Sequence, residues 1–89
     1  MTKDQIQAYL ESAWEGETFL LADGFEEAFV GVVYGKMRAP VACYDRAHCI
    51  AILTAQGMTE DEAEEFFSLN VDDAWVGEKT PMFCVKPSN

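Results

Sequence analysis

Residues 28–56, "AFVGVVYGKMRAPVACYDRAHCIAILTAQ", decide the fold because they predict two strands and a helix in immediate succession. The segment Ala28 to Gly35 is rich in β-branched and aromatic residues and ends at a glycine, which predicts a strand. Both faces of that strand are apolar, so we expect it to lie centrally in a sheet, covered on each side. After the connection KMRAP, Val41 to Tyr44 predicts a second strand, paired antiparallel with the first because the loop is short.

A helix is expected directly after the second strand. Asp45 is a favourable N-cap residue, and the helix runs from Arg46 to Gln56, where Gly57 ends it. Its apolar residues lie nearly all the way around it: Ala47, Cys49, Ile50, Ala51, Ile52, Leu53 and Ala55. A helix of this kind is usually buried, or half-buried with its other side in a subunit contact. The helix Arg46–Gln56 is therefore the contact that we expect in a homodimer.

Two further helices are predicted to begin with capping boxes. Thr2 with Gln5 starts the first, an amphipathic helix of about three turns that Gly16 ends. Thr59 with Glu62 starts another, after the apolar helix. The residues expected to face the core are Ile6, Tyr9, Leu10, Ala13 and Trp14 in the first helix, and Ala63, Phe66 and Phe67 in the other.

The last stretch, Ala74 to Val85, predicts an edge strand or a hairpin, with Pro81 placed where the sheet needs no backbone donor. The order of elements is then α-β-β-α-α-β. We therefore predict an α+β fold in which a small antiparallel sheet packs against helices. Residues 1–89 are expected to form a single small globular domain, with 86–89 as a short tail.

The net charge excludes several classes of partner. Sixteen acidic residues against six basic ones give a formal net charge of -10. Direct binding of DNA, RNA or an anionic membrane needs a basic surface, which argues against all three. A basic protein partner, a cation, or a solvated acidic surface fits better. No apolar stretch is long enough for a secretory signal or a membrane span, and an odd count of cysteines in apolar surroundings predicts reduced thiols in a cytoplasm.

No catalytic residue, metal site or cofactor is predicted. The candidate ligands Cys43, His48, Cys49 and Cys84 lack the paired spacing with which a short loop binds zinc. Cys49 and His48 are neighbours on a helix, so their side chains do not face each other. No nucleophile elbow, phosphate loop or dinucleotide motif occurs. These observations favour a protein without an enzymatic activity.

The run from Glu60 to Glu78 contains eight carboxylates and no Lys or Arg. Negative charge in the first turn of a helix is favourable, which accounts for Glu60, Asp61 and Glu62. Glu64 and Glu65 lie beyond most of that benefit and repel the earlier acids at three- and four-residue spacing. We therefore predict a solvent-facing acidic surface that binds a partner, with Trp75 as an aromatic anchor. Its residues are Asp61, Glu64, Glu65, Asp72, Asp73 and Trp75.

Four segments, "ADGFEEAFVGV", "ACYDRAHCI", "GMTEDEAEEFF" and "NVDDAWVGEKTPMF", carry a resemblance over residues 22–83. Together they resemble a family of small, acidic, uncharacterised proteins encoded by bacteriophages and prophages. The resemblance implies a virus-encoded protein in a bacterial cytoplasm, and it assigns no catalytic or binding residue. Small acidic phage proteins often occupy a positively charged surface on a host factor, such as a nuclease or a DNA-binding defence complex.

The predicted function is that of a non-enzymatic phage accessory protein, which binds a host or phage protein through its anionic surface as an inhibitor or a nucleic-acid mimic. One alternative is a structural module that self-associates through Arg46–Gln56. The other is a small ligand-binding domain or enzyme, with a pocket near Tyr44, Asp45, His48 and Trp75.

Overall fold

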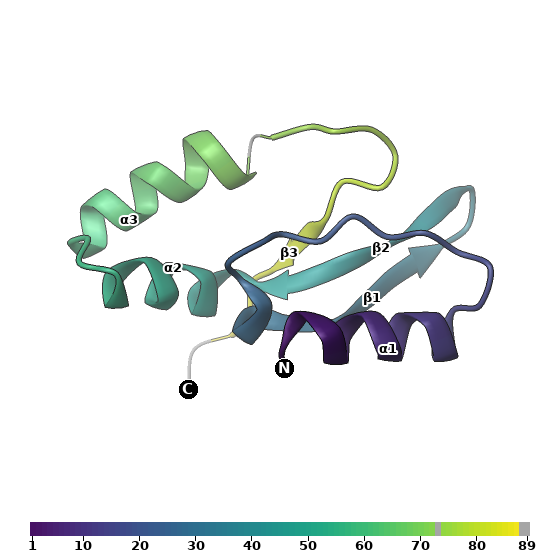
Figure 1. Cartoon of the computed structure of the whole chain (residues 1–89). Helices are drawn as coiled ribbons and strands as arrows, with labels where there is room; N and C mark the ends of the chain where they lie inside the picture. The colour runs from purple at the N-terminus through teal and green to yellow at the C-terminus, as the bar shows by residue number, and fades with distance from the viewer. Residues whose placement is uncertain (73, 88–89) are drawn as a thin grey trace.

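The computed structural model describes residues 1–72 and 74–87, and its elements follow the order α-β-β-α-α-β (Figure 1). The helices are α1 (Lys3–Ala13), α2 (Arg46–Ala55) and α3 (Glu60–Phe67), and the strands are β1 (Phe29–Gly35), β2 (Arg38–Asp45) and β3 (Met82–Cys84). A short 3-10 turn, Glu26–Ala28, precedes β1, and a π-helical turn, Ser68–Asp72, extends α3. The protein therefore has the predicted α+β fold.

The sheet has the strand order β1-β2-β3. β1 pairs antiparallel with β2, with Phe29 opposite Tyr44, as the short connection predicts. β3 pairs parallel with β2, with Phe83 opposite Tyr44, so the sheet is mixed rather than purely antiparallel. The reason is that the chain between β2 and β3 forms a crossover through α2 and α3, which returns it in the original direction.

The central strand is β2, whereas the sequence predicted a central position for the segment 28–35. β1 lies at the edge of the sheet, and α1 runs beside it (Figure 1). The ring centres of Tyr9 and Phe29 are 6.3 Å apart, and the ring centres of Trp14 and Tyr34 are 5.5 Å apart. A helix that covers one face of an edge strand thus accounts for apolar residues from which the sequence predicted a central strand.

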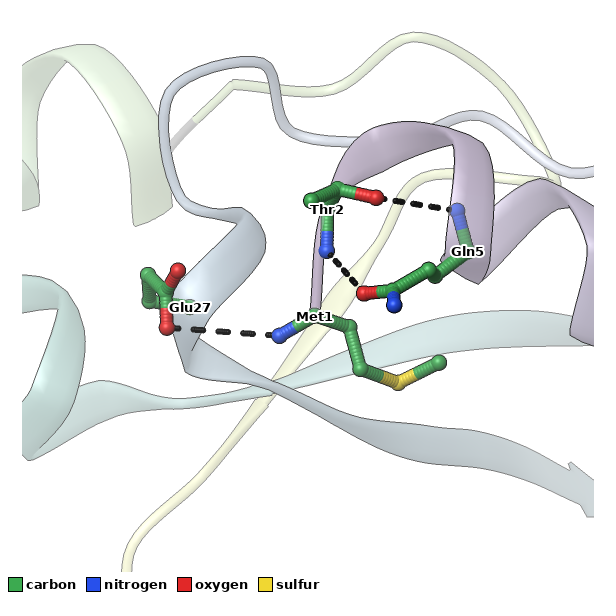
Figure 2. A network of polar contacts seen from close by, with 4 residues as sticks. All are labelled: Met1, Thr2, Gln5 and Glu27. Carbon is green, nitrogen blue, oxygen red and sulfur yellow. Dashed lines mark hydrogen bonds and ion pairs between the residues drawn. The ribbon is translucent and has the colours of Figure 1, made fainter.

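Both predicted capping boxes are present. Figure 2 shows the first, in which the Thr2 N–H donates to Gln5 Oε1 at 2.8 Å and the Gln5 N–H donates to Thr2 Oγ1 at 3.2 Å. The amino group of Met1 lies 4.0 Å from the Glu27 carboxylate, which links the start of α1 to the turn before β1 (Figure 2). Thr59 and Glu62 form the second box at the start of α3.

The core is centred on the buried ring of Tyr44 in β2. The centre of this ring lies 5.7 Å from the centre of the Phe29 ring and 6.1 Å from that of the Phe83 ring. The Phe83 ring in turn meets the Phe67 ring edge-on, with 4.9 Å between their centres. The Tyr44 hydroxyl accepts a hydrogen bond from the Ala22 N–H at 2.8 Å. Through these contacts the central strand is joined to both neighbouring strands, to α3 and to the loop after α1.

Helix α2 buries Cys49, Ile50 and Leu53 in the core, and its Ile52 packs against the core while partly exposed. Its exposed side consists of small residues and one histidine: Ala47, His48, Ala51 and Ala55. Asp45 stands at the N-cap position, but its side chain forms no capping hydrogen bond; its Oδ2 lies 3.7 Å from Lys86 Nζ. A homodimer contact through Arg46–Gln56 stays a prediction, which sedimentation over a range of concentrations tests.

The stretch from Ala74 to Val85 contributes one short edge strand, Met82–Cys84, so the edge-strand alternative is confirmed and the hairpin alternative is wrong. The segment before it, residues 74–81, crosses the molecule from the end of α3 to the sheet (Figure 1). Pro81 precedes the strand, where its missing N–H interrupts no ladder. Of the predicted tail, Lys86 is described and lies near Asp45, while Ser88 and Asn89 lie outside the described residues.

Candidate functional site

The first turn of α3 carries Glu60, Asp61 and Glu62, and part of this charge has a structural purpose. The Glu62 carboxylate accepts a hydrogen bond from the Thr59 N–H at 2.9 Å. This backbone hydrogen bond holds the pKa of Glu62 below its ordinary value. The carboxylate at this position therefore stabilises the start of the helix, as the capping-box pattern predicts.

Glu64 faces solvent as predicted, with 43% of its side chain exposed, but it forms an ion pair with Arg46, which offsets the repulsion expected from its acidic neighbours. Arg46 Nη2 lies 2.5 Å from Glu64 Oε2, and Arg46 Nη1 lies 3.5 Å from Glu64 Oε1. The hydrogen bond from Arg46 lowers the pKa of Glu64. The spacing of residues within α3 could not reveal this partner, because Arg46 belongs to α2.

The exposed side of α3 combines acidic and apolar side chains. Asp61 and Glu65 are exposed, and so are Phe66, at 39% of its surface, and Leu69 in the π-helical turn, at 64%. A shallow hollow of about 260 Å³ is lined by Glu62, Glu65, Phe66, Leu69 and Asn70. We call Asp61, Glu62, Glu65, Phe66 and Leu69 the acidic-apolar face.

Phe66 was predicted to face the core together with Ala63 and Phe67. The structure buries Ala63 and Phe67 completely and leaves Phe66 partly exposed. Successive residues of an α-helix diverge by about 100°, so one narrow contact with α2 and β3 covers only one of the two phenylalanines. The signal that the sequence offered was the spacing of Glu62, Phe66 and Leu69, which places all three on one side of the helix.

The remaining predicted residues are not gathered on this face. Asp72 is exposed at the end of the π-helical turn, and Asp73 lies outside the described residues. Trp75, exposed at 76% of its surface, lines a separate hollow of about 350 Å³ with Met37, Arg38, Ala39 and Glu78. That hollow lies at the β1–β2 turn, which Figure 1 shows at the opposite end of the molecule from the start of α3.

The described basic side chains leave the acidic-apolar face without a counter-charge. Four of them form ion pairs elsewhere: Lys3 with Asp23 at 3.2 Å, Arg46 with Glu64, Lys79 with Glu17 at 3.6 Å, and Lys86 with Asp45. Lys36 and Arg38 flank the β1–β2 turn, far from α3 (Figure 1). Within residues 1–72 and 74–87, no ion pair is formed by Asp61, Glu65 or Asp72.

The three cysteines and His48 differ in their exposure to solvent. Cys49 is fully buried, and burial raises the pKa of its thiol to about 12, which keeps it protonated and unreactive at neutral pH. Cys43 is also buried, Cys84 is exposed, and His48 lies on the exposed side of α2. In the part of the chain that the structure describes, no group of three His, Cys, Asp or Glu side chains could hold a metal ion.

The predicted pocket near Tyr44, Asp45, His48 and Trp75 is not assembled. Tyr44 is fully buried and its hydroxyl is already hydrogen-bonded to the backbone of Ala22. Trp75 lies instead beside the β1–β2 turn. The two aromatic residues that were to line the pocket therefore belong to different parts of the molecule.

Comparisons with known proteins gave no match to a family model, to a curated protein or to a solved structure. Among the described helices, none has both the length and the apolar character that a passage through a bilayer requires.

Proposed function

We propose that this protein is a non-enzymatic binding module, which captures a basic protein partner through the acidic-apolar face of α3. The observation that carries the proposal is the combination of exposed carboxylates and exposed apolar side chains around one hollow. Asp61 and Glu65 have no ion-pair partner among the described residues, and Phe66 and Leu69 line the same hollow as Glu65. A surface of this kind offers long-range attraction and a local apolar contact at the same place.

The two kinds of side chain would contribute differently. Exposed carboxylates accelerate the encounter with a positively charged surface and favour one orientation, while adding little to the final affinity. Most of the binding energy in an interface comes from a few buried aromatic or aliphatic anchors surrounded by a polar rim. Phe66 and Leu69 are the anchors in this proposal, and Asp61, Glu62 and Glu65 form the rim.

We further propose the setting of a phage-encoded protein in a bacterial cytoplasm, which the sequence resemblance and the net charge of -10 support. A partner in that setting with a strongly basic surface would be a protein that binds nucleic acid. Occupation of its basic surface by the carboxylates of α3 would compete with the phosphate backbone and inhibit it.

Affinity capture from a bacterial host extract tests the proposal, with a pair of matched double variants. Asp61→Lys with Glu65→Lys reverses two charges on the acidic-apolar face. Asp4→Lys with Glu11→Lys is the control, because it makes the same change of net charge on the exposed side of α1, and Asp4 has the same place in its helix as Asp61. We expect the control to retain the captured protein and the α3 variant to lose it. Equal capture by the two variants would contradict the proposal.

A further inference from the structure

A second hollow, of about 330 Å³, lies between the loop after α1 and the segment that crosses from α3 to β3. We call it the crossover groove and define it by Leu20, Val71, Val76, Pro81 and Phe83, which line it. Its apolar lining is partly open to solvent, since Val76 is exposed at 62% of its surface and Leu20 is also exposed. The groove is therefore an apolar surface that remains in contact with water.

The floor of the groove is ordered because Phe83, which is partly buried, packs against the core. Its ring packs on those of Tyr44 and Phe67. Phe83 also pairs with Tyr44 in the parallel ladder of β2 and β3. A side chain that entered the groove would meet a surface already ordered by the fold, which lowers the entropy lost on binding.

The outer wall of the groove is also held in place. The Val76 N–H donates to Thr80 Oγ1 at 2.9 Å, and the Thr80 hydroxyl donates to the Gly77 carbonyl at 2.6 Å. Lys79 Nζ donates to the Pro40 carbonyl at 2.5 Å and lies 4.5 Å from the centre of the Phe19 ring. The crossing segment is thus tied both to itself and to the sheet, so the groove is preformed.

The lining of the groove is uncharged, and the residue that follows Val71 in the chain is acidic. Lys79 is the one basic residue of the sequence 74–81, and its ammonium group is directed to Glu17 and Pro40. Asp72, directly after Val71, is exposed, and so is Glu78, whose side chain lines the hollow at the β1–β2 turn. The groove begins at Val71, and the preceding residue, Asn70, lines the hollow of the acidic-apolar face. The two surfaces are therefore adjacent along the chain, and each adjoins an exposed carboxylate.

We propose that the crossover groove binds an apolar side chain of the same basic partner, so that the partner presents an amphipathic segment with Lys or Arg beside an aliphatic or aromatic anchor. This inference rests on the proposed function and adds the chemistry of the contact segment. Charge complementarity selects this occupant over a second copy of the chain, which would bring a further net charge of -10 to a surface that is already acidic.

Two synthetic peptides test the inference by NMR titration of the full chain at low ionic strength. One combines lysine and leucine at helical spacing, and the other has serine in place of every leucine. Val76→Asn is the groove variant, and Val85→Asn is its matched control, since Val85 is exposed at 77% of its surface outside the groove. Both valines are mostly exposed, so both variants are expected to fold.

We expect the lysine–leucine peptide to shift the amide resonances of Val71, Val76 and Phe83, and Val76→Asn to weaken its binding on the order of tenfold while Val85→Asn has no effect. Tighter binding of the lysine–leucine peptide with shifts confined to α3 and no effect of Val76→Asn would overturn the groove and leave the proposed function standing. Failure of both peptides to bind would contradict the proposed function itself.

Discussion

Arg46 Nη2 lies 2.5 Å from Glu64 Oε2, so the first residue of α2 is tied to the middle of α3. The same guanidinium lies over the Phe67 ring, with its central carbon 5.4 Å from the ring centre. One arginine thus contacts both a surface carboxylate and a core aromatic ring. This arrangement separates Glu64, which joins two helices, from its neighbour Glu65, which is exposed and available to a partner.

Glu64→Gln and Glu65→Gln are predicted to have different effects on stability. The first removes the charge that pairs with Arg46, so we expect a melting temperature lower by no more than about 4 °C, since a pair this exposed contributes little. The second removes repulsion within α3 and should leave the melting temperature equal or higher. Thermal denaturation of both variants at neutral pH is the measurement, and equal melting temperatures would contradict the assigned ion pair.

The effect of Glu64→Gln should depend on pH. Arg46 lowers the pKa of Glu64 in the folded chain below the ordinary value of 4.5, so the unfolded chain binds the proton more tightly. The stabilisation by this carboxylate is therefore present above that value and is lost as the pH falls through the folded pKa. We expect the melting temperatures of wild type and Glu64→Gln to converge in acid. A difference that persists unchanged to the acid limit would rule out the ion pair as its cause.

The adjacent residues Phe66 and Phe67 are predicted to differ strongly on truncation. Phe67 is fully buried against Phe83, so Phe67→Ala leaves a cavity and should lower the free energy of unfolding by about 3–5 kcal/mol. Phe66 is partly exposed, and Phe66→Ala should lower it by less than about 1.5 kcal/mol while weakening partner binding. Urea denaturation measures both values. Similar losses for the two variants would mean that α3 is turned differently about its axis.

The sequence allowed the capping boxes, the two antiparallel strands and the burial of Cys49, Ile50 and Leu53 to be predicted, because each depends on residues close together in the chain. The parallel pairing of β3 could not be predicted in this way. It is set by Phe83, which packs between Tyr44 and Phe67 after a crossover of two helices. The β1 edge position was missed for a related reason, since Tyr9 and Trp14 of α1 cover part of its apolar surface.

The sequence predicted the negative charge of the candidate site, but not which residues share its surface. The excess of carboxylates on α3 follows from the sequence, and Asp61 and Glu65 are exposed as expected. The pairing of Glu64 depends on Arg46, eighteen residues away, and the exposure of Phe66 depends on how α3 is turned against α2. Contacts between helices therefore decided which of the predicted residues share a surface.

Lys79 is predicted to stabilise both the fold and the shape of the crossover groove. Lys79→Met removes the ammonium group that lies over the Phe19 ring, pairs with Glu17 and donates a hydrogen bond to the Pro40 carbonyl. We expect the free energy of unfolding to fall by about 1–2 kcal/mol, because the lost hydrogen bond involves a charged donor. Hydrogen exchange should become faster in residues 76–80. Unchanged stability and exchange would show that Lys79 does not hold the segment.

Alkaline pH is predicted to destabilise the protein through its buried thiol. Burial raises the pKa of Cys49 to about 12, whereas an unfolded chain ionises near the ordinary value of 9.0. Between these values the unfolded state binds fewer protons, so stability falls as the pH rises. In urea denaturation, the stability difference between wild type and Cys49→Ala should narrow from pH 9 upward. A constant difference across this range would contradict burial of the thiol.

The most direct test of the acidic-apolar face is the dissociation constant of the captured partner, measured by calorimetry with three forms of the protein. Wild type and the Asp4→Lys, Glu11→Lys control should bind with the same constant, and Asp61→Lys with Glu65→Lys should bind at least about tenfold more weakly. The wild-type affinity should also fall as salt is added. Equal constants for all three forms would contradict the account, because the partner would then recognise some other part of the molecule.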